Sequence, residues 1–394
     1  MTEYYILLQK ILGAGNKRVK PLLKKFGSAA AIFSAEETAL KACGMLTEKQ
    51  IKAIKNADIG AASKILNSCK QSGITVISVC DKAYPKLLAA IDNPPLVLYA
   101  KGNIDLLGEP CICIVGPRKV SVYGKKAAFS LGARLAAGGF TVVSGGAVGA
   151  DTAAHLGALS VSGNTICVFP SGLNSSYLKS NDKLREKIAQ NGLLISEYPP
   201  ETELFKGMIP IRNRIMSGLS LGTVVTEAPA KSGALITADM AAEQNRDVFI
   251  VPGRLADPYY EGSNQRIIDG AAALTDAHII FGEYAALLGD KINPEKAFST
   301  RVNMVESEHS APQKAQKRET IPPKPEKPKN IVKNTTISLS KSAKIVYNNL
   351  NKQIFSFDEI RCSELSDSEL LAAVTELEIK GLIKAIAGGR YEIK

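Results

Sequence analysis

The chain has 394 residues, 45% of them hydrophobic, and a formal net charge of +11. Its length predicts two or three domains with sizeable cores, and no apolar run is long enough to cross a bilayer. Its seven cysteines and three histidines show no zinc-site spacing, so we expect reduced thiols in a cytoplasmic protein without metal or cofactor. The basic excess favours a polyanionic partner over an acidic small molecule.

The positive charge is concentrated in two parts of the chain. Residues 1–80 hold 12 Lys and Arg against 5 Asp and Glu, and residues 312–334 hold 7 against 2. Residues 81–311 are nearly neutral, with 22 against 23, and residues 335–394 balance at 8 against 8. Any anion site in the middle of the chain must therefore come from the local arrangement of its residues.

Residues 1–74 predict a small helical module of the SAM or helix-hairpin-helix type. The stretch Leu12–Arg18 contains two glycines and precedes an amphipathic run to Phe26. A glycine turn of this kind can aim backbone N–H groups at a phosphate, and nearby lysines favour that role. Because any packed helical hairpin also uses glycine, contact with DNA and simple packing both remain open.

Residues 75–290 predict an extended Rossmann-like, doubly wound α/β core. Short apolar strands alternate there with helices, and continuous apolar strands of this kind are typical of a parallel sheet covered on both faces. The expected strands are Cys111–Val115, Thr141–Val143, Thr165–Phe169, Leu193–Ile195, Thr223–Val225 and Val248–Val251. Such sheets bind ligands at the carboxyl ends of their strands, where this chain places its glycine-bearing turns.

These turns predict an anion cradle, since turns that end strands and open helices bind phosphate through backbone N–H groups. The candidate residues of the turns are Gly116, Arg118, Ser144, Gly145, Gly146, Ser232 and Gly233. The two serines lack a recognisable His/Asp partner, which favours hydroxyl-to-phosphate bonding over nucleophilic catalysis. We expect Asp151 to complement the N-terminus of the following helix and His155 to be structural.

The run Arg212-Asn213-Arg214 adds two guanidinium groups and an amide, a dense array of donors that suits phosphate oxygens. Positions two apart on a helix point in different directions. One arginine is therefore expected to face the cradle while the other pairs with Glu197 or Glu227. Among aromatic residues, Tyr177 is the main candidate for stacking a base, and the lesser candidates are Tyr123 and Phe169.

The C-terminal part of the chain predicts a disordered basic linker rich in proline and lysine over residues 291–336, followed by a winged helix over residues 337–394. Helices are expected at Ser340–Leu350, Ser356–Arg361 and Ser366–Leu382, with a β-ribbon turning at Gly388-Gly389. The third helix carries the carboxylates Asp367, Glu369, Glu376 and Glu378. They would repel a DNA groove, which favours a protein-contacting module.

Taken together, the motifs resemble the DprA/Smf family of bacterial DNA-processing proteins, over roughly residues 75–285. In family order they are Tyr84–Leu87, Pro94–Gly102, Val115–Arg118, Ser144–Asp151, Ser196–Pro199, Arg212–Arg214, Ser232-Gly233, Arg246–Gly253 and Gly262–Asn264. The resemblance implies a non-enzymatic homodimer that binds single-stranded DNA and loads a RecA-type recombinase during natural transformation.

The resemblance also implies phosphate contacts from Arg118 and from Lys179, Lys183, Arg212 and Arg214. Three positions depart from the family: Pro117 stands where Ser is common, Val148 where Arg is common, and Ile209 where Phe is usual. Because the first two changes remove a hydroxyl, an N–H and a cation, DNA affinity is expected to be lower or to depend more on the basic flanks.

The alternative function is a nucleotide-processing enzyme. Phosphoribohydrolases of nucleoside monophosphates share the glycine-rich core but carry a Pro-Gly-Gly-x-Gly-Thr-x-x-Glu loop, whereas this chain has the apolar stretch Leu221–Glu227. Without the paired glycines the loop cannot wrap a phosphate in the same way, although Glu227 could still act as an acid or base. A third possibility is a scaffold whose pocket is vestigial.

Overall fold

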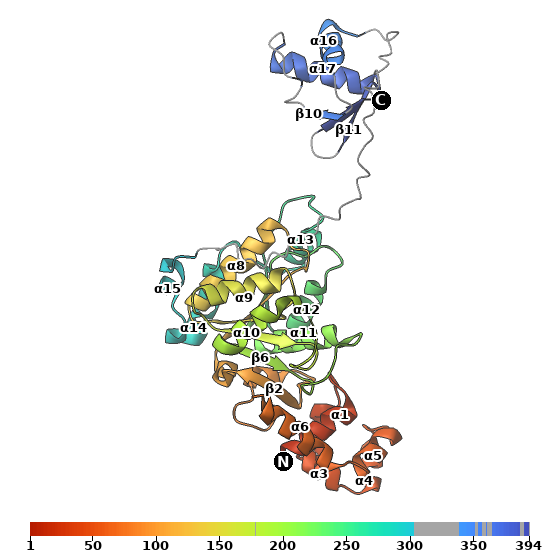
Figure 1. Ribbon diagram of the computed structural model, residues 1–394, viewed down its shortest axis with the longest axis vertical. Coiled ribbons are helices and arrows are strands. Elements are labelled where there is room, and N and C mark those ends of the chain that lie inside the picture. Colours follow the sequence, from red (N-terminus) through yellow and green to blue (C-terminus); the bar gives the residue numbers. More distant parts are fainter. Residues whose placement is uncertain are drawn as a thin grey trace. The chain divides into compact units, whose positions relative to one another are not determined.

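The computed structural model describes residues 1–177, 179–302, 339–350, 354–356, 360, 365–386 and 390–393. The chain divides into two compact units, residues 1–309 and 310–394 (Figure 1). Among the described residues, no helix has the length and hydrophobicity that crossing a lipid bilayer requires.

Six short helices form the N-terminal part of the first unit. They are α1 (Thr2–Leu12), α2 (Val19–Phe26), α3 (Ala29–Ser34), α4 (Glu37–Ala42), α5 (Glu48–Lys55) and α6 (Ile59–Gln71). Side-chain caps set several of their starts: Ser28 accepts the N–H of Ala31, and Thr47 and Gln50 form a capping box. Their apolar faces share one hydrophobic cluster with strands of the core, so the predicted module packs as part of the same unit (Figure 1).

A nine-stranded sheet forms the centre of the first unit, in the order β1-β2-β6-β5-β4-β3-β7-β8-β9. The strands are β1 (Thr75–Ser78), β2 (Val97–Gly102), β3 (Cys111–Val115), β4 (Thr141–Ser144), β5 (Thr165–Phe169), β6 (Leu193–Ser196), β7 (Gly222–Val225), β8 (Asp247–Ile250) and β9 (Ala272–Ala273). Strands β3 to β9 are mutually parallel, which confirms the predicted α/β class. Strands β1 and β2, which the sequence analysis did not predict, extend the β6 edge in antiparallel pairing.

Helices cover both faces of this sheet, as the apolar strands predict. They are α7 (Lys86–Ala90), α8 (Val122–Ala137), α9 (Ala150–Ser160), α10 (Asp182–Asn191), α11 (Met208–Leu219), α12 (Gly233–Glu243), α13 (Glu261–Ile268) and α14 (His278–Leu288). One hydrophobic cluster joins α7, α11 and α12 to the sheet, and another joins α8, α9 and α14 to its opposite face. The arrangement is therefore a doubly wound, Rossmann-like core.

Helices α8 and α9 pack with backbone nearly touching backbone. A methyl group added at Gly157 would overlap the carbonyl oxygen of Phe129, and one at Gly132 would overlap that of Ala154. In contrast, Gly282 lies on α14 with open space around the same position.

Gly157→Ala is therefore expected to lower the free energy of unfolding by about 2 kcal/mol or more, because the two helices must separate. Gly282→Ala serves as the matched control and is expected to raise it by roughly 0.5–1 kcal/mol through helix propensity alone. Urea denaturation of both variants measures the difference. Equal effects would show that the α8–α9 contact tolerates a side chain.

Helix α15 (Pro294–Ser299) occupies the start of the predicted linker. Asn293 caps it by accepting the N–H of Lys296 at 2.8 Å, Pro294 begins it, and Ala297 is fully buried. The ordered unit thus continues past residue 291, where the loss of apolar periodicity predicted a linker. The rest of that predicted linker, residues 303–336, lies outside the described residues.

The second unit contains α16 (Lys341–Asn349), β10 (Ile354–Ser356), α17 (Asp367–Ile379), β11 (Ile383–Ile386) and β12 (Arg390–Ile393). The strands pair antiparallel in the order β10-β12-β11. Helices α16 and α17 correspond to the first and third predicted helices. Ser356 ends a strand instead of beginning a helix, most of the predicted Ser356–Arg361 helix lies outside the described residues, and so do Gly388 and Gly389.

Two of the carboxylates predicted on the third helix are engaged inside the second unit. Glu369 completes a capping box with Ser366 at the start of α17. Glu376 accepts the N–H of Ser340 at 3.0 Å and pairs with Lys380 at 3.2 Å. These bonds stabilise the helix start and its contact with α16.

Candidate functional site

The sheet has a topological switch point between β3 and β7. From β3 the chain runs outward through β4, β5 and β6, and then crosses back to β7 on the other side of β3. Adjacent crossovers therefore diverge at this point, and doubly wound sheets bind ligands outside the carboxyl ends of such strands. Gly116 follows β3 here, and a Cβ at this position would lie 2.5 Å from Thr226 Oγ1 and from Ala150 Cβ, which leaves room only for glycine.

The loop after Gly116 carries two exposed cations, Arg118 and Lys119. The guanidinium of Arg118 makes no hydrogen bond or ion pair within the described part of the chain. It lies close to Tyr177: burial raises the pKa of that phenol, and the positive charges of Arg212 and Arg118 oppose the rise. The loop therefore presents an exposed cation, unpaired among the described residues, at the carboxyl edge of the sheet beside the switch point.

Glu227 holds the far end of this loop. Its fully buried carboxylate accepts the backbone N–H of Ser121 at 3.1 Å, the Ser121 hydroxyl, and the Tyr260 hydroxyl at 2.9 Å. Ser121 in turn caps α8 by accepting the N–H of Gly124 at 3.0 Å. Burial raises the pKa of Tyr260 to about 12, so the phenol stays a donor at neutral pH. Glu227 thus fixes the loop that carries Arg118, a role that the sequence analysis did not foresee.

The glycine loop after β4 already contains a carboxylate. Asp151, in the first turn of α9 as predicted, is buried and turns back to accept the N–H of Ala147 at 3.3 Å. Burial raises its pKa, while the charge of Arg212 and hydrogen bonds from Ala147, Ser144 and Gly145 oppose the rise. The carboxyl group of Asp151 therefore occupies the inner side of the loop and accepts one of its backbone N–H groups.

Arg212 is buried and bonded to the ends of two strands. It donates from Nη1 to the carbonyl oxygens of Gly145, at 2.8 Å, and of Val168, and from Nε to Asn213 Oδ1 at 3.2 Å. Asn213 is buried beside it, and the hydroxyl of Ser144 donates to the carbonyl of Ile114 at 2.7 Å. These predicted contacts therefore face the interior, where they hold the carboxyl ends of β3, β4 and β5 together.

Arg214 forms a buried ion pair with Glu197 at 2.5 Å, the pairing that the sequence analysis expected for one of the two arginines. Burial raises the pKa of Glu197, and the adjacent guanidinium opposes that rise. The N–H of Gly15, in the N-terminal glycine turn, donates to Glu197 at 3.4 Å. Asn93 donates to the carbonyl of Gly15 at 3.1 Å, so this turn packs against the core.

Lys179 and Lys183 are exposed near the glycine loop, on the 3₁₀-helix η2 (Lys179–Asn181) and on α10. Asn181 ties this segment to the loop by donating to the carbonyl of Gly146 at 2.9 Å. Tyr177 is half-buried, with its ring edge-on to Phe169 at 6.4 Å. Its hydroxyl is buried and has no partner among the described residues, so the ring is packed inward instead of open for stacking.

Ser232 caps α12 by accepting the N–H of Ala234 at 3.3 Å, and Gly233 beside it is exposed. This helix start follows β7, so both predicted residues lie along the same carboxyl edge of the sheet.

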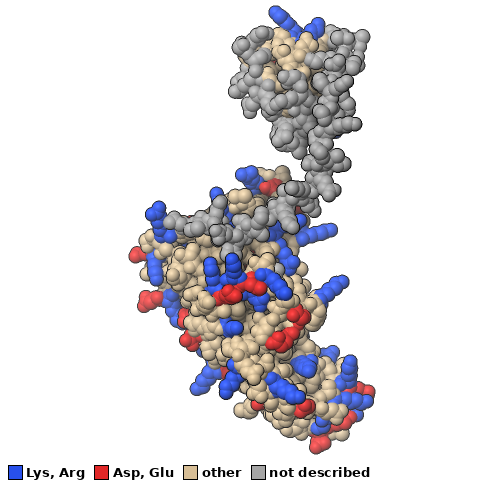
Figure 2. Space-filling model, viewed as in Figure 1, with Lys and Arg blue, Asp and Glu red and all other residues tan. Residues whose placement is uncertain are grey.

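On the face shown in Figure 2, basic and acidic side chains are interspersed, as the near-neutral charge of residues 81–311 predicts. No single broad basic stripe is visible on this face.

His155 lies behind the glycine loop and is fully buried, with Nδ1 2.7 Å from the hydroxyl of Thr165. Burial, helped by the charge of Arg212, lowers its pKa to about 3. The folded state therefore binds no proton at His155 between pH 6.5 and 3, whereas the unfolded state does, and stability falls as pH falls through this window.

Between pH 6.5 and pH 5, wild type is expected to lose about 2 kcal/mol of unfolding free energy relative to His155→Gln. Urea denaturation of both proteins across this range isolates the histidine, since the other titrating groups are common to both. A gap that does not change with pH would contradict the buried neutral imidazole.

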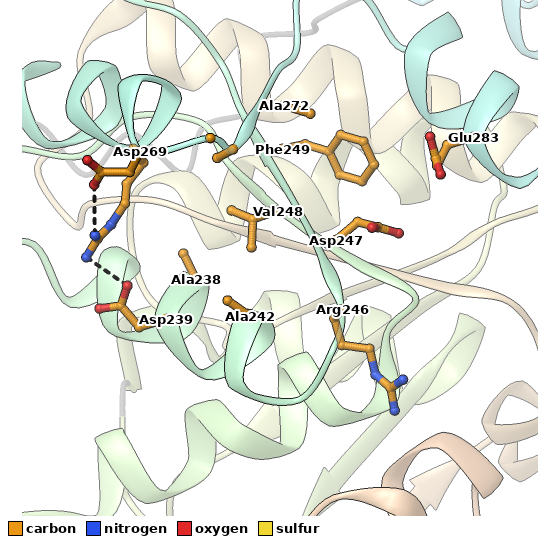
Figure 3. Close-up of a pocket in the computed structure, with 13 residues that line it drawn as sticks. Ala238, Asp239, Ala242, Arg246, Asp247, Val248, Phe249, Asp269, Ala272 and Glu283 are labelled. Atoms are coloured by element: carbon orange, nitrogen blue, oxygen red, sulfur yellow. Dashed lines mark hydrogen bonds and ion pairs between the residues drawn. The ribbon is translucent and has the colours of Figure 1, made fainter.

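A hollow of about 470 Å³ lies at the lateral edge of the sheet, beside β8 and β9 (Figure 3). Three of its charged groups pair with one another: Arg266 contacts Asp239 at 2.7 Å and Asp269 at 3.2 Å. Asp247 accepts the hydroxyl of Tyr284 at 2.6 Å. None of the predicted site residues lines this hollow, so it is distinct from the carboxyl-edge site.

The architecture and the edge site define a Rossmann-like protein with an ordered, cation-bearing loop at its switch point. The family model for DNA recombination-mediator protein A matches residues 75–285. The DNA processing protein DprA of Bacillus subtilis is 42% identical over 221 residues, which cover 56% of this chain and 74% of that protein. The DprA of Streptococcus pneumoniae is 40% identical over 207 residues, which cover 52% and 73%.

The X-ray structure of DprA from Streptococcus pneumoniae superposes with a TM-score of 0.64 at 32% identity, covering 72% of this chain and 98% of that one. The chain belongs to the DNA recombination-mediator protein A family. This confirms the resemblance to DprA and Smf proteins that the motifs indicated.

Proposed function

We propose that this protein binds single-stranded DNA along the carboxyl edge of its sheet, with Arg118 as the central phosphate contact. The observation that carries the proposal is the pairing state of Arg118: it is exposed and unpaired within the described part of the chain, on a loop that Glu227 fixes. Because the backbone of this loop is already fixed, only the side chain of Arg118 has to be ordered when it binds a phosphate, which lowers the entropic cost of the contact.

The surrounding contacts follow from exposure. Lys119, Lys179 and Lys183 are exposed on neighbouring segments and reach a strand that passes Arg118, while the start of α12 at Ser232 and Gly233 offers backbone N–H groups. Ser144, Arg212, Asn213 and Arg214 are buried, so we assign them the support of the edge instead of direct contact.

We further propose that the protein is not an enzyme. Asp151 occupies the glycine loop where a nucleotide phosphate would sit, and three hydrogen bonds from Ser121 and Tyr260 engage Glu227. Release of free base from a nucleoside monophosphate, abolished in Glu227→Gln, would support the phosphoribohydrolase alternative.

The biological role that we propose is that of a cytoplasmic homodimer which loads a RecA-type recombinase onto incoming DNA in natural transformation. The basic segment 312–334 would add electrostatic attraction for DNA.

We propose that the second unit is a winged helix that contacts protein. Leu371 and Ile379 of α17 are 56% and 81% exposed, which favours an apolar partner surface over a DNA groove.

Photo-crosslinking tests where the strand lies. An oligo-dT carrying 5-iodo-deoxyuridine is irradiated with the full-length protein, and the labelled peptides are identified by mass spectrometry. We expect adducts in residues 116–126 and 177–183. Adducts confined to residues 1–74 or 303–394 would overturn the proposed site.

A further inference from the structure

Four large apolar side chains are exposed on two segments that follow the carboxyl ends of β3 and β8. Val122 and Tyr123, in the first turn of α8, are 75% and 54% exposed. Leu255 and Tyr259, in the loop between β8 and α13, are 92% and 50% exposed. Single exposed apolar residues are ordinary on protein surfaces, but a group that gathers at a ligand-binding edge indicates an interaction site.

Contacts of Tyr123 join the start of α8 to the loop between β8 and α13. The ring of Tyr123 meets the buried ring of Tyr260 edge to face, with centroids 5.9 Å apart, and its hydroxyl donates to the carbonyl of Pro252 at 3.4 Å. Tyr260 is fixed by its bonds to Glu227 and Ser121, at 2.9 Å each. Tyr123 is therefore held on one side while half of its surface stays open.

Tyr259 directly precedes this anchor and faces outward. Its backbone N–H donates to the carboxylate of Asp257 at 3.0 Å, so this side chain turns toward the backbone of the loop. An exposed cation stands five residues before each ring in the sequence: Arg118 before Tyr123 and Arg254 before Tyr259. Aromatic rings interleaved with cations suit an unpaired strand, because its bases present their faces for stacking and its phosphates attract the cations.

We propose that Tyr123 and Tyr259 form a base-stacking platform, which extends the strand path from Arg118 to Arg254. This inference rests on the proposed single-stranded DNA binding and names the residues that recognise the bases. Tyr123 replaces Tyr177 in this role, because the ring of Tyr177 packs on Phe169 and its hydroxyl is buried. Because the ring of Tyr123 is already held by its contacts, little further side-chain entropy is lost when a base stacks on it.

The test compares full-length wild type and variants on two fluorescent strands of equal length, oligo-dT and an abasic strand with the same phosphates. Wild type is expected to bind oligo-dT more tightly. Tyr123→Ala is expected to weaken oligo-dT binding about 5- to 100-fold, since one stacked base is lost, and to leave abasic binding and the salt dependence unchanged. Tyr123→Phe should retain wild-type affinity, and Tyr259→Ala should repeat the loss.

The outcomes separate this platform from the proposed function. Equal, salt-sensitive binding of both strands by wild type would overturn the platform and leave single-strand binding intact. Absence of salt-sensitive binding to either strand would overturn both. Sedimentation velocity adds a further check: if Tyr123→Ala and Leu255→Ser convert a dimer to a monomer while the preference for oligo-dT persists, the patch joins two copies of the chain and the platform is overturned.

Discussion

Arg118→Ala is expected to weaken the binding of oligo-dT about 10- to 100-fold. The expected size is that of one charge-assisted hydrogen bond to a phosphate, made by a side chain that has no competing partner among the described residues. The slope of log affinity against log salt should also fall by about 0.7, because one fewer counterion equivalent is released from a single strand. Fluorescence anisotropy across a salt series measures both quantities.

The matched control is Lys291→Ala. Lys291 is an exposed cation whose backbone carbonyl packs against the Gly139 turn at the amino end of β4, opposite the proposed site. The Lys291→Ala variant loses the same charge as Arg118→Ala, but away from the proposed site. Its affinity for oligo-dT should therefore stay within about twofold of wild type. Equal losses in the two variants would mean that the protein attracts DNA by overall charge and that Arg118 holds no particular phosphate.

Arg214→Met is expected to lower the free energy of unfolding by about 3–5 kcal/mol. The substitution leaves the buried carboxylate of Glu197 without its cation, and uncompensated buried charges are strongly destabilising. Because Glu197 also accepts the N–H of Gly15, the N-terminal helices should loosen from the core. Chemical denaturation gives the first quantity, and hydrogen exchange of residues 1–26 reports the second.

The double variant Arg214→Met, Glu197→Leu is the control for this pair. Replacing both charges by apolar groups is often neutral, and here Nε and Nη1 of Arg214 are already buried without partners in the described part of the chain. The double variant should therefore recover most of the lost stability. A single variant that loses less than about 1 kcal/mol would show that the pair is open to water.

The sequence predicted the parallel core well because its strands are continuous apolar runs with turn residues at each end. All six expected strands form, with bounds that differ by at most one residue. Strands β1 and β2 escaped prediction because they pair antiparallel at the sheet edge, outside the alternating pattern of the core. Helix α15 was also missed, since its six residues are too few to show a hydrophobic period and its signal was the Asn293-Pro294 start.

The site was predictable in position but less so in detail. Strand-end glycines located the carboxyl edge, and the exposure of Arg118 agrees with a contact role. Residue chemistry alone could not place Arg212, because its partners are carbonyls of Gly145 and Val168, which lie far away in the sequence. A guanidinium group satisfies backbone carbonyls as readily as phosphate oxygens, and only the fold decides between them.

The Glu227 contacts had a weak signal in the sequence. A serine such as Ser121 is typical of a helix N-cap, where its hydroxyl accepts the N–H three residues on, here that of Gly124. The carboxylate that in turn accepts the N–H of Ser121 belongs to Glu227, 106 residues further on. Asp151 illustrates the same limit: its place in the first turn of α9 was predictable, while its return to the N–H of Ala147 depends on the loop conformation.

The most direct test of the proposed site compares the full-length protein with residues 1–302, using oligo-dT and a duplex of equal length across a salt series. Residues 1–302 contain the whole carboxyl edge and belong to one compact unit. We expect them to retain a salt-sensitive preference for the single strand, with affinity within about tenfold of the full chain. Loss of that preference without residues 303–394, or equal binding of the duplex, would contradict a single-stranded DNA site at this edge.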